Sequence, residues 1–131
     1  MAPARAIESH VAPRIHAAAA AAGRRPPRIV AGLPVAVHDD EAEARSAAAT
    51  YSTAYAGRAN YERILGIGGV STPVEAAIVG DEKAVSAALR GLLDAGATDI
   101  WAAVFPVGRD RQERAESTRR TTDLLRELAT R

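Results

Sequence analysis

The chain contains no cysteine, which excludes disulfides, thiolate chemistry and cysteine-ligated metals. It also lacks an excess of charge of either sign: 17 Lys and Arg residues stand against 16 Asp and Glu residues, giving a net charge of +1. That balance gives no electrostatic reason to expect nucleic acid or an anionic membrane as a partner. Proline, glycine or charge interrupts every apolar run before it reaches membrane-spanning length, and Glu8 and His10 interrupt any secretory signal. We therefore expect a soluble, cytoplasmic protein.

The most informative stretch runs from Ile78 to Ile100, in a chain whose 131 residues are normally one domain. Asp81 is placed to cap a helix, and Gly96 supplies the left-handed residue that ends it. Between these two residues, apolar side chains recur at three- and four-residue spacing. They predict one stripe that packs on a neighbouring element: Ala84, Val85, Ala88, Leu89 and Leu92.

Two segments are predicted to be buried strands, 28–37 and 98–105. Both are apolar, and the second has no charge after its second residue, which is typical of a parallel strand covered on both faces. Trp101 and Phe105 share one face of the second strand, and we expect both in the core. Pro34 removes a backbone donor, so we expect the first strand to lie at an edge or to be irregular there.

The N-terminal region is predicted to hold an alanine-rich helix over 12–22 that packs closely on a neighbour. Gly23 marks its end. Because proline is tolerated only in the first turn of a helix, we place its start at Ala12 or Pro13.

Further helices follow from capping signals. Asp40 and Glu43 form a capping box for a helix that runs to about Ala56, and Thr72 followed by Pro73 opens a short one. A single turn is expected over 61–65, and a final helix over 110–129 with an apolar face of Leu124, Leu125 and Leu128.

The predicted order is helix, strand, helix, short helix, helix, strand, helix, which indicates an α/β fold built from parallel βα units. Two parallel strands alone leave rows of backbone donors and acceptors unpaired. We therefore expect further strands to complete the sheet.

Several motifs were weighed as ligand sites. The glycines of 66–69 suggest a phosphate loop, but no strand precedes them and no Gly-Lys-Ser/Thr follows, which favours a hinge or lid connector. His10 and His16 do not share a helical face well, and no carboxylate lies at ligand spacing. We expect no metal site and interpret both histidines as surface or interface residues.

The ends of the two predicted strands supply the candidate site residues, because the carboxyl ends of parallel strands hold the chemistry in barrels and open sheets. His38 follows the first strand; the simpler interpretation is that Asp39 and Asp40 cap a helix and His38 is solvated. Phe105, followed by Pro106, ends the second strand and could line a pocket mouth, although core packing explains it as well. No catalytic residue is assigned.

Four segments of the chain carry a resemblance to a known family: 11–15 (VAPRI), 30–37 (VAGLPVAV), 39–45 (DDEAEAR) and 79–99. In this order they resemble the C-terminal part of luciferase-like monooxygenases. The nearest likeness is to the actinobacterial branch that uses the deazaflavin coenzyme F-420 instead of FMN.

The resemblance implies that residues 1–131 are the C-terminal portion of a (β/α)8 TIM barrel, with 28–37 similar to the seventh strand and 98–105 to the eighth. The first six strands are absent, and the family's cofactor pocket draws mainly on them. F-420 or FMN would thus belong to the complete barrel, with a small-molecule substrate, and we expect no cofactor bound by this chain alone.

Three hypotheses follow. The chain is part of a flavin- or deazaflavin-dependent oxidoreductase without activity of its own. Alternatively, it is a stand-alone βα remnant that associates with a complementing chain or with itself through open strand edges. A third possibility, an unrelated doubly wound domain, requires additional strands.

Overall fold

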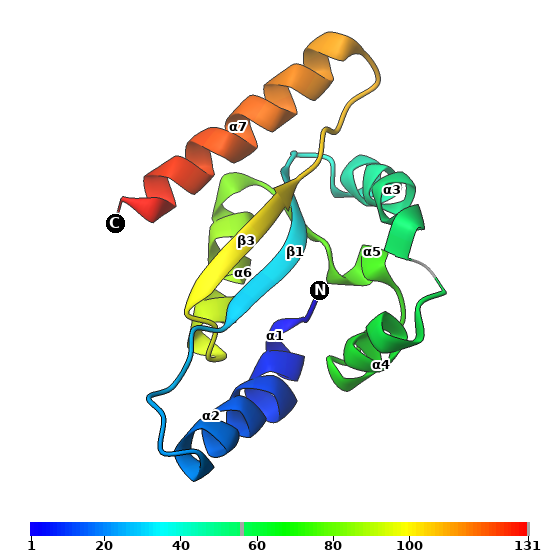
Figure 1. Ribbon diagram of the computed structural model, residues 1–131. Coiled ribbons are helices and arrows are strands. Elements are labelled where there is room, and N and C mark those ends of the chain that lie inside the picture. Colours follow the sequence, from blue (N-terminus) through cyan, green and yellow to red (C-terminus); the bar gives the residue numbers. More distant parts are fainter. Residues whose placement is uncertain (56, 131) are drawn as a thin grey trace.

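A three-stranded parallel sheet lies between helices on both faces in the computed structural model, which describes residues 1–55 and 57–130 (Figure 1). The strands are β1 (Val30–Val37), β2 (Ile78–Gly80) and β3 (Asp99–Val104), in the order β2-β1-β3. The predicted α/β class and the two predicted strands are confirmed. The sequence prediction lacked β2, because three residues are too few to show strand alternation.

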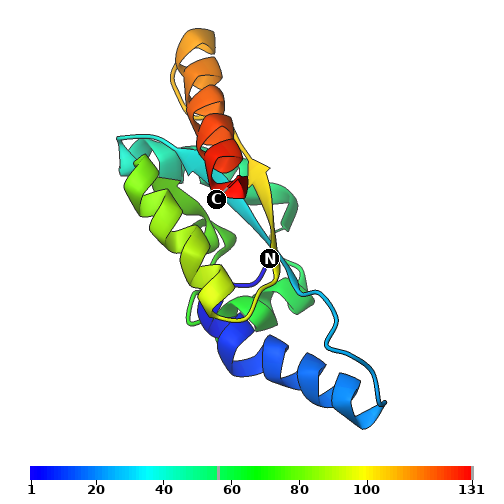
Figure 2. The ribbon, with the colours of Figure 1, turned by 90° about the vertical axis from the view of Figure 1, so that its left-hand side faces the viewer.

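The strand order places helices on opposite faces. The chain moves in one direction from β1 to β2 and in the other from β2 to β3, and right-handed crossovers of opposite direction cover opposite faces. α3 (Glu41–Tyr51) therefore packs on one face and α6 (Glu82–Asp94) on the other (Figures 1 and 2). In a (β/α)8 barrel each strand lies beside the next one in sequence. Here β2 and β3 are separated by β1, as at the switch point of a doubly wound sheet.

Pro34 lies in the central strand and not in an edge strand as expected, but at a position where β1 has no strand on its β2 side. The amide of His38 donates to Gly80 beside β2 at 2.9 Å, and the carbonyl of Val35 accepts from Phe105 beside β3 at 3.2 Å. Backbone groups of even-numbered β1 residues therefore face β2. β2 pairs with β1 only from Val35 onward. The nitrogen of Pro34 therefore faces no partner strand, and its missing N–H costs the sheet no hydrogen bond.

Each face of the sheet has its own core. The larger one lies under α6, where the predicted stripe is confirmed at three positions: Val85, Leu89 and Leu92 are buried. Ala84 and Ala88 are exposed, and Ser86 is buried in their place. The smaller core lies under α3 and is made of Ala36, Ala44, Ala48, Ala77, Val79, Phe105 and Val107.

The N-terminal helix starts earlier than predicted: α1 (Ala4–Ala6), a π-helical turn (Ile7–Val11) and α2 (Ala12–Ala21) are continuous. The widened π turn accommodates Pro13, which has no N–H for the carbonyl four residues back and would crowd it. The alanines of α2 are mostly exposed, and α2 extends away from the sheet, so the predicted close packing is wrong (Figures 1 and 2). The high helix propensity of alanine maintains the helix up to Gly23 without a neighbour.

The predicted caps are confirmed, although Glu43 does not complete the capping box, because its carboxylate pairs with His38. The side chains of Asp40, Thr72 and Asp81 each accept a hydrogen bond from the amide three residues further on, and Asp110 does the same for α7 (Arg111–Ala129). Thr72 opens α5, which spans Pro73–Ala76. Short polar side chains that precede a helix thus predicted its start reliably.

The segment after α3 differs from the prediction. A 3-10 turn (Ser52–Tyr55) follows α3, and the predicted end of that helix at Ala56 lies outside the described residues. The turn expected over 61–65 is a full helix, α4 (Ala59–Ile67), which includes the start of the predicted glycine connector. A Cβ at Gly68 would lie 2.7 Å from the ring of Pro3, so this glycine allows the N-terminus to pack on the end of α4.

Helices cover the α3 face of the sheet only near the carboxyl ends of the strands. Phe105 is buried there as predicted, but Trp101 is 65 % exposed and Val30 is 59 % exposed, so the expectation of Trp101 in the core is wrong. The indole of Trp101 lies across Gly32, where a Cβ would come within 3.0 Å of Cε3. The amino-terminal half of this face is therefore open, and β3 is not covered on both faces.

Candidate functional site

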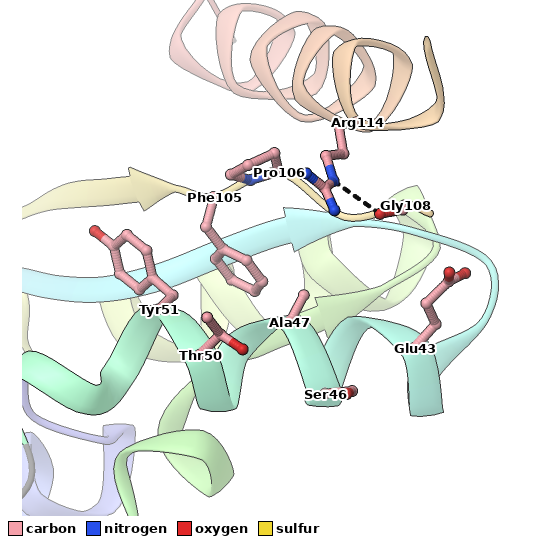
Figure 3. A pocket seen from close by; sticks show the side chains of 9 residues that line it. All are labelled: Glu43, Ser46, Ala47, Thr50, Tyr51, Phe105, Pro106, Gly108 and Arg114. Carbon is pink, nitrogen blue, oxygen red and sulfur yellow. Dashed lines mark hydrogen bonds between the residues drawn. The ribbon is translucent and has the colours of Figure 1, made fainter. Parts of the chain in front are cut away.

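A pocket of about 450 Å³ opens at the carboxyl ends of β1 and β3, between α3 and the start of α7 (Figure 3). We call it the carboxyl-end pocket. Tyr51 and Phe105 form its aromatic wall, with ring centroids 5.5 Å apart and planes 24° from parallel. Arg114 enters from α7, where its Nε donates to the Gly108 carbonyl at 2.9 Å. The other lining residues are Glu43, Ser46, Ala47, Thr50 and Pro106.

The topology explains why the pocket lies here. β1 and β3 are adjacent, but β1 leads into α3 on one face and β3 leads into α7 on the other. The two departing segments leave a crevice between them. Parallel α/β sheets bind ligands in such crevices, outside the carboxyl ends of the strands.

His38 does not line this pocket but contacts Glu43, which does. Its Nε2 is 2.8 Å from Glu43 Oε2 and its side chain is only 18 % exposed, so the interpretation as a solvated histidine is wrong. Glu43 Oε1 also lies 3.6 Å from Nε of Arg109. The carboxylate that lines the pocket is therefore linked to an imidazole that it can orient.

The sequence left open whether Phe105 packs in the core or lines a pocket. Phe105 does both, because it is buried in the smaller core and also lines the carboxyl-end pocket. Tyr51, which stacks on it, was not predicted as a site residue. Burial, and then the neighbouring Tyr55, raise the pKa of Tyr51, so its hydroxyl stays protonated and available as a donor at neutral pH. The wall thus offers a flat apolar surface beside a hydroxyl and the Arg114 guanidinium.

A cluster of charged side chains attaches α7 to α6 and to the loop that follows β1. Arg120 donates to Glu82 at 2.8 and 2.9 Å and to Asp39 at 2.9 and 3.2 Å. Asp40 caps α3 as predicted, but Asp39 pairs with Arg120 instead of capping. The hydrogen bonds from Arg120 lower the pKa of both Asp39 and Glu82, and the two carboxylates raise the pKa of Arg120.

Two buried hydroxyl groups of α7 form hydrogen bonds with the backbone at the end of β1. The amide of Val37 donates to Thr121 Oγ1 at 2.8 Å, and Ser117 Oγ donates to the Val37 carbonyl at 2.9 Å. Both Val37 groups point to the β3 side, beyond the last strand pairing at Val35. Sequence reasoning missed this contact; its signal was two small hydroxyl residues four apart in a helix that is otherwise mostly charged.

The helix starts near the carboxyl ends of the strands do not suit the phosphate group of a flavin or deazaflavin coenzyme. A phosphate group binds well at free helix N-termini, and α3, α6 and α7 all start at the carboxyl end of the sheet. One first-turn amide of each helix donates to a capping carboxylate, that of Asp40, Asp81 or Asp110. The capping carboxylates place negative charge at each of these helix starts, which disfavours a phosphate group there.

The other sequence candidates do not join this pocket. His10 is half-buried and His16 is exposed, both on the N-terminal helix. Among residues 1–55 and 57–130, no three His, Asp or Glu side chains gather as metal ligands would, and no helix combines the length and apolar character needed to cross a membrane.

Comparisons with protein-family models, with curated proteins and with solved structures found no match. The likeness to luciferase-like proteins therefore rests on the four sequence segments alone.

Proposed function

We propose that this chain is the C-terminal part of a cytoplasmic luciferase-like oxidoreductase that uses F-420 or FMN to transfer hydride to, or to oxygenate, a small-molecule substrate. Two neighbouring parallel strands with a pocket between their carboxyl ends carry the proposal. β1 and β3 would correspond to the seventh and eighth strands of a TIM barrel, and β2, which lies on the other side of β1, would belong to an insertion after the seventh strand. Below Val35, no strand among the described residues pairs with the β2 side of β1.

The pocket residues have distinct roles in this proposal. The Tyr51–Phe105 wall holds the flat or apolar part of the substrate, and Arg114 pairs with an anionic group. Glu43, held by His38, accepts a hydrogen bond from the substrate. The coenzyme would supply the redox chemistry when bound, and strands outside this chain would hold it.

The test begins with the DNA upstream of Met1. An in-frame segment with strand–helix alternation supports the proposal, and a stop codon with a ribosome-binding site contradicts it. The longer chain and the 131-residue chain are then titrated with F-420 and with FMN by fluorescence. We expect binding only by the longer chain, because the contacts available here do not offset the free energy of association, several kcal/mol or more.

A dissociation constant in the low micromolar range for the 131-residue chain would show that the cofactor site is misplaced. His38 would then be the first residue to substitute. In the longer chain, Arg114→Gln should raise KM for an anionic substrate, whereas Arg111→Gln, an exposed arginine on the same helix outside the pocket, should leave it unchanged.

A second candidate is an interaction module without catalysis. The exposed Trp101 and Val30 on the open face of the sheet favour it, because contiguous exposed apolar surface marks interaction sites. Size-exclusion chromatography with light scattering tests this role. We expect self-association, and a sharp monomer peak that is stable to dilution and melts cooperatively would contradict it.

A further inference from the structure

β3 has a free edge. Its odd-numbered residues face β1: the amides of Asp99 and Phe105 donate to the carbonyls of Ile29 and Val35, both at 3.2 Å. By strand alternation, the N–H and C=O groups of the even-numbered residues point away from the sheet. No strand among the described residues pairs with that side, which faces the viewer in Figure 2. The outward residues are Ile100, Ala102 and Val104.

This edge lacks the features that usually protect edge strands. It contains no lysine, and its first proline is Pro106, beyond the end of the strand. Its one charged residue, Asp99, lies at the amino-terminal end and is held there by Arg28. The remaining five residues of β3 are apolar, so the edge is suited to pairing with another strand.

Apolar surface borders the edge on both faces of the sheet. Trp101 lies on the open face. On the other face, a groove of about 770 Å³ between α6 and α7 reaches β3. The apolar residues that line the groove are Leu89, Leu93, Ile100, Ala102, Leu125, Leu128 and Ala129.

We propose that β3 pairs antiparallel with β3 of a second copy of this chain, with Ala102 at the two-fold axis. In an antiparallel ladder, opposed outward residues exchange two hydrogen bonds. With the axis at Ala102, Ala102 lies opposite Ala102 of the second copy, and Ile100 lies opposite Val104 of the second copy. Every outward N–H and C=O group of these residues then has a hydrogen-bond partner. The edge is therefore complementary to itself, as a two-fold interface requires. Pro106, with no N–H to donate, ends the ladder.

The side chains and charges fit the antiparallel arrangement. Trp101 lies opposite Ala103 of the second copy, so a large side chain meets a small one. The two Asp99–Arg28 pairs lie at opposite ends of the ladder, whereas a parallel pairing would place like charges side by side. The α6–α7 grooves of the two copies meet at the axis, which joins their apolar surfaces.

This proposal rests on the second candidate function and specifies its surface. It does not involve the carboxyl-end pocket.

The absence of cysteine from the chain permits a direct test. In Ala102→Cys, the two thiols meet at the axis, where the Cα separation of about 5.5 Å of a hydrogen-bonded pair suits a disulfide. Under mild oxidation we expect disulfide-linked dimer to form about tenfold faster than in Ala49→Cys, an exposed control on α3, because pairing raises the effective thiol concentration. Circular dichroism establishes that both variants are folded.

Light scattering gives an independent readout. The wild-type chain should be a dimer that Trp101→Lys dissociates, while Val30→Lys, on the same face but on β1, leaves it intact. A dimer that cross-links equally at both cysteines and is insensitive to Trp101→Lys would overturn the β3 pairing and keep the interaction role. A monomer at all concentrations would overturn both, and it would also count against an incomplete barrel, in which the outer edge of the eighth strand is left open. The upstream DNA tests the oxidoreductase proposal separately.

Discussion

α6 and α7 pack on the same face of the sheet by different means. α6 is attached by an apolar stripe, in which Val85, Leu89 and Leu92 are buried in the larger core. α7 buries Leu124, packs the partly buried Leu125 and Leu128 against the same core, and is further fixed by hydroxyl groups at the end of β1 and by Arg120. A stripe is non-directional and tolerates small shifts, whereas hydrogen bonds and bidentate ion pairs fix position. Since α7 carries Arg114 into the carboxyl-end pocket, the directional attachment is on the helix that positions a site residue.

The largest effect is expected from Leu89→Asp, at the centre of the α6 stripe. Leu89 is 3 % exposed, and a buried, unpaired carboxylate costs several kcal/mol, on the order of the stability of a small domain. Thermal melting by circular dichroism should show an unfolded or insoluble variant. Leu93→Asp is the matched control, because Leu93 lies on the same helix and is 45 % exposed. If Leu89→Asp melts like the wild type, the assignment of the buried face is wrong.

A smaller loss is expected from Thr121→Val on α7. The variant keeps the shape of the side chain but leaves the buried Val37 amide without its acceptor, which costs about 1–3 kcal/mol. Thr122→Val is the control: the Thr122 hydroxyl bonds only to Thr118 of its own helix. Urea unfolding should separate the two variants, and equal midpoints would show that the hydroxyl contact does not hold α7.

Arg120→Gln should lower the free energy of unfolding by less than about 1 kcal/mol, because the carboxylate partners of Arg120 are partly or largely exposed. Arg119→Gln, whose partner Asp123 is 3.4 Å away on the exposed side of α7, should change nothing measurable. A difference between these two variants that vanishes in high salt would support an electrostatic attachment. A difference that persists would indicate packing of the Arg120 stem instead.

The smallest expected effect is the pH dependence of the difference in stability between the wild type and Arg120→Gln. Arg120 lowers the folded-state pKa of Asp39 and Glu82, so the cluster's contribution is complete above the unfolded pKa of about 4 and is lost as pH falls through the lowered values. The gap in stability between wild type and Arg120→Gln should therefore narrow from pH 6 to pH 2. Urea midpoints across this range provide the measurement, and a gap that widens in acid contradicts the assigned direction.

The comparison also explains which features the sequence could predict. The apolar stripe of α6 and the capping residues leave periodic or positional signals within a few residues, so the starts of the side-chain-capped helices and both long strands were found. The leucines of α7 were also predicted, but its polar attachment was not, because Ser117, Thr121 and Arg120 acquire their roles only when the end of β1 is beside them.

The errors share a cause, since each depends on what lies next to a residue. Pro34 fits a central strand because β2 starts one residue later. Trp101 is exposed because α3 covers only one end of its face. In the candidate site, the strand ends identified His38 and Phe105, but the wall formed by Tyr51 and the entry of Arg114 depend on how α3 and α7 depart from the sheet.

Trp101 is the one tryptophan of the chain, and it lies on the open face rather than in either core. Its emission therefore senses what approaches that face, since indole fluorescence responds to the polarity around the ring. Covering the edge of β3 should shift the emission to shorter wavelength as protein concentration rises. Loosening of the cores should change it little until the strands themselves separate. The residue that sequence reasoning placed in the interior is in effect an intrinsic optical reporter of assembly.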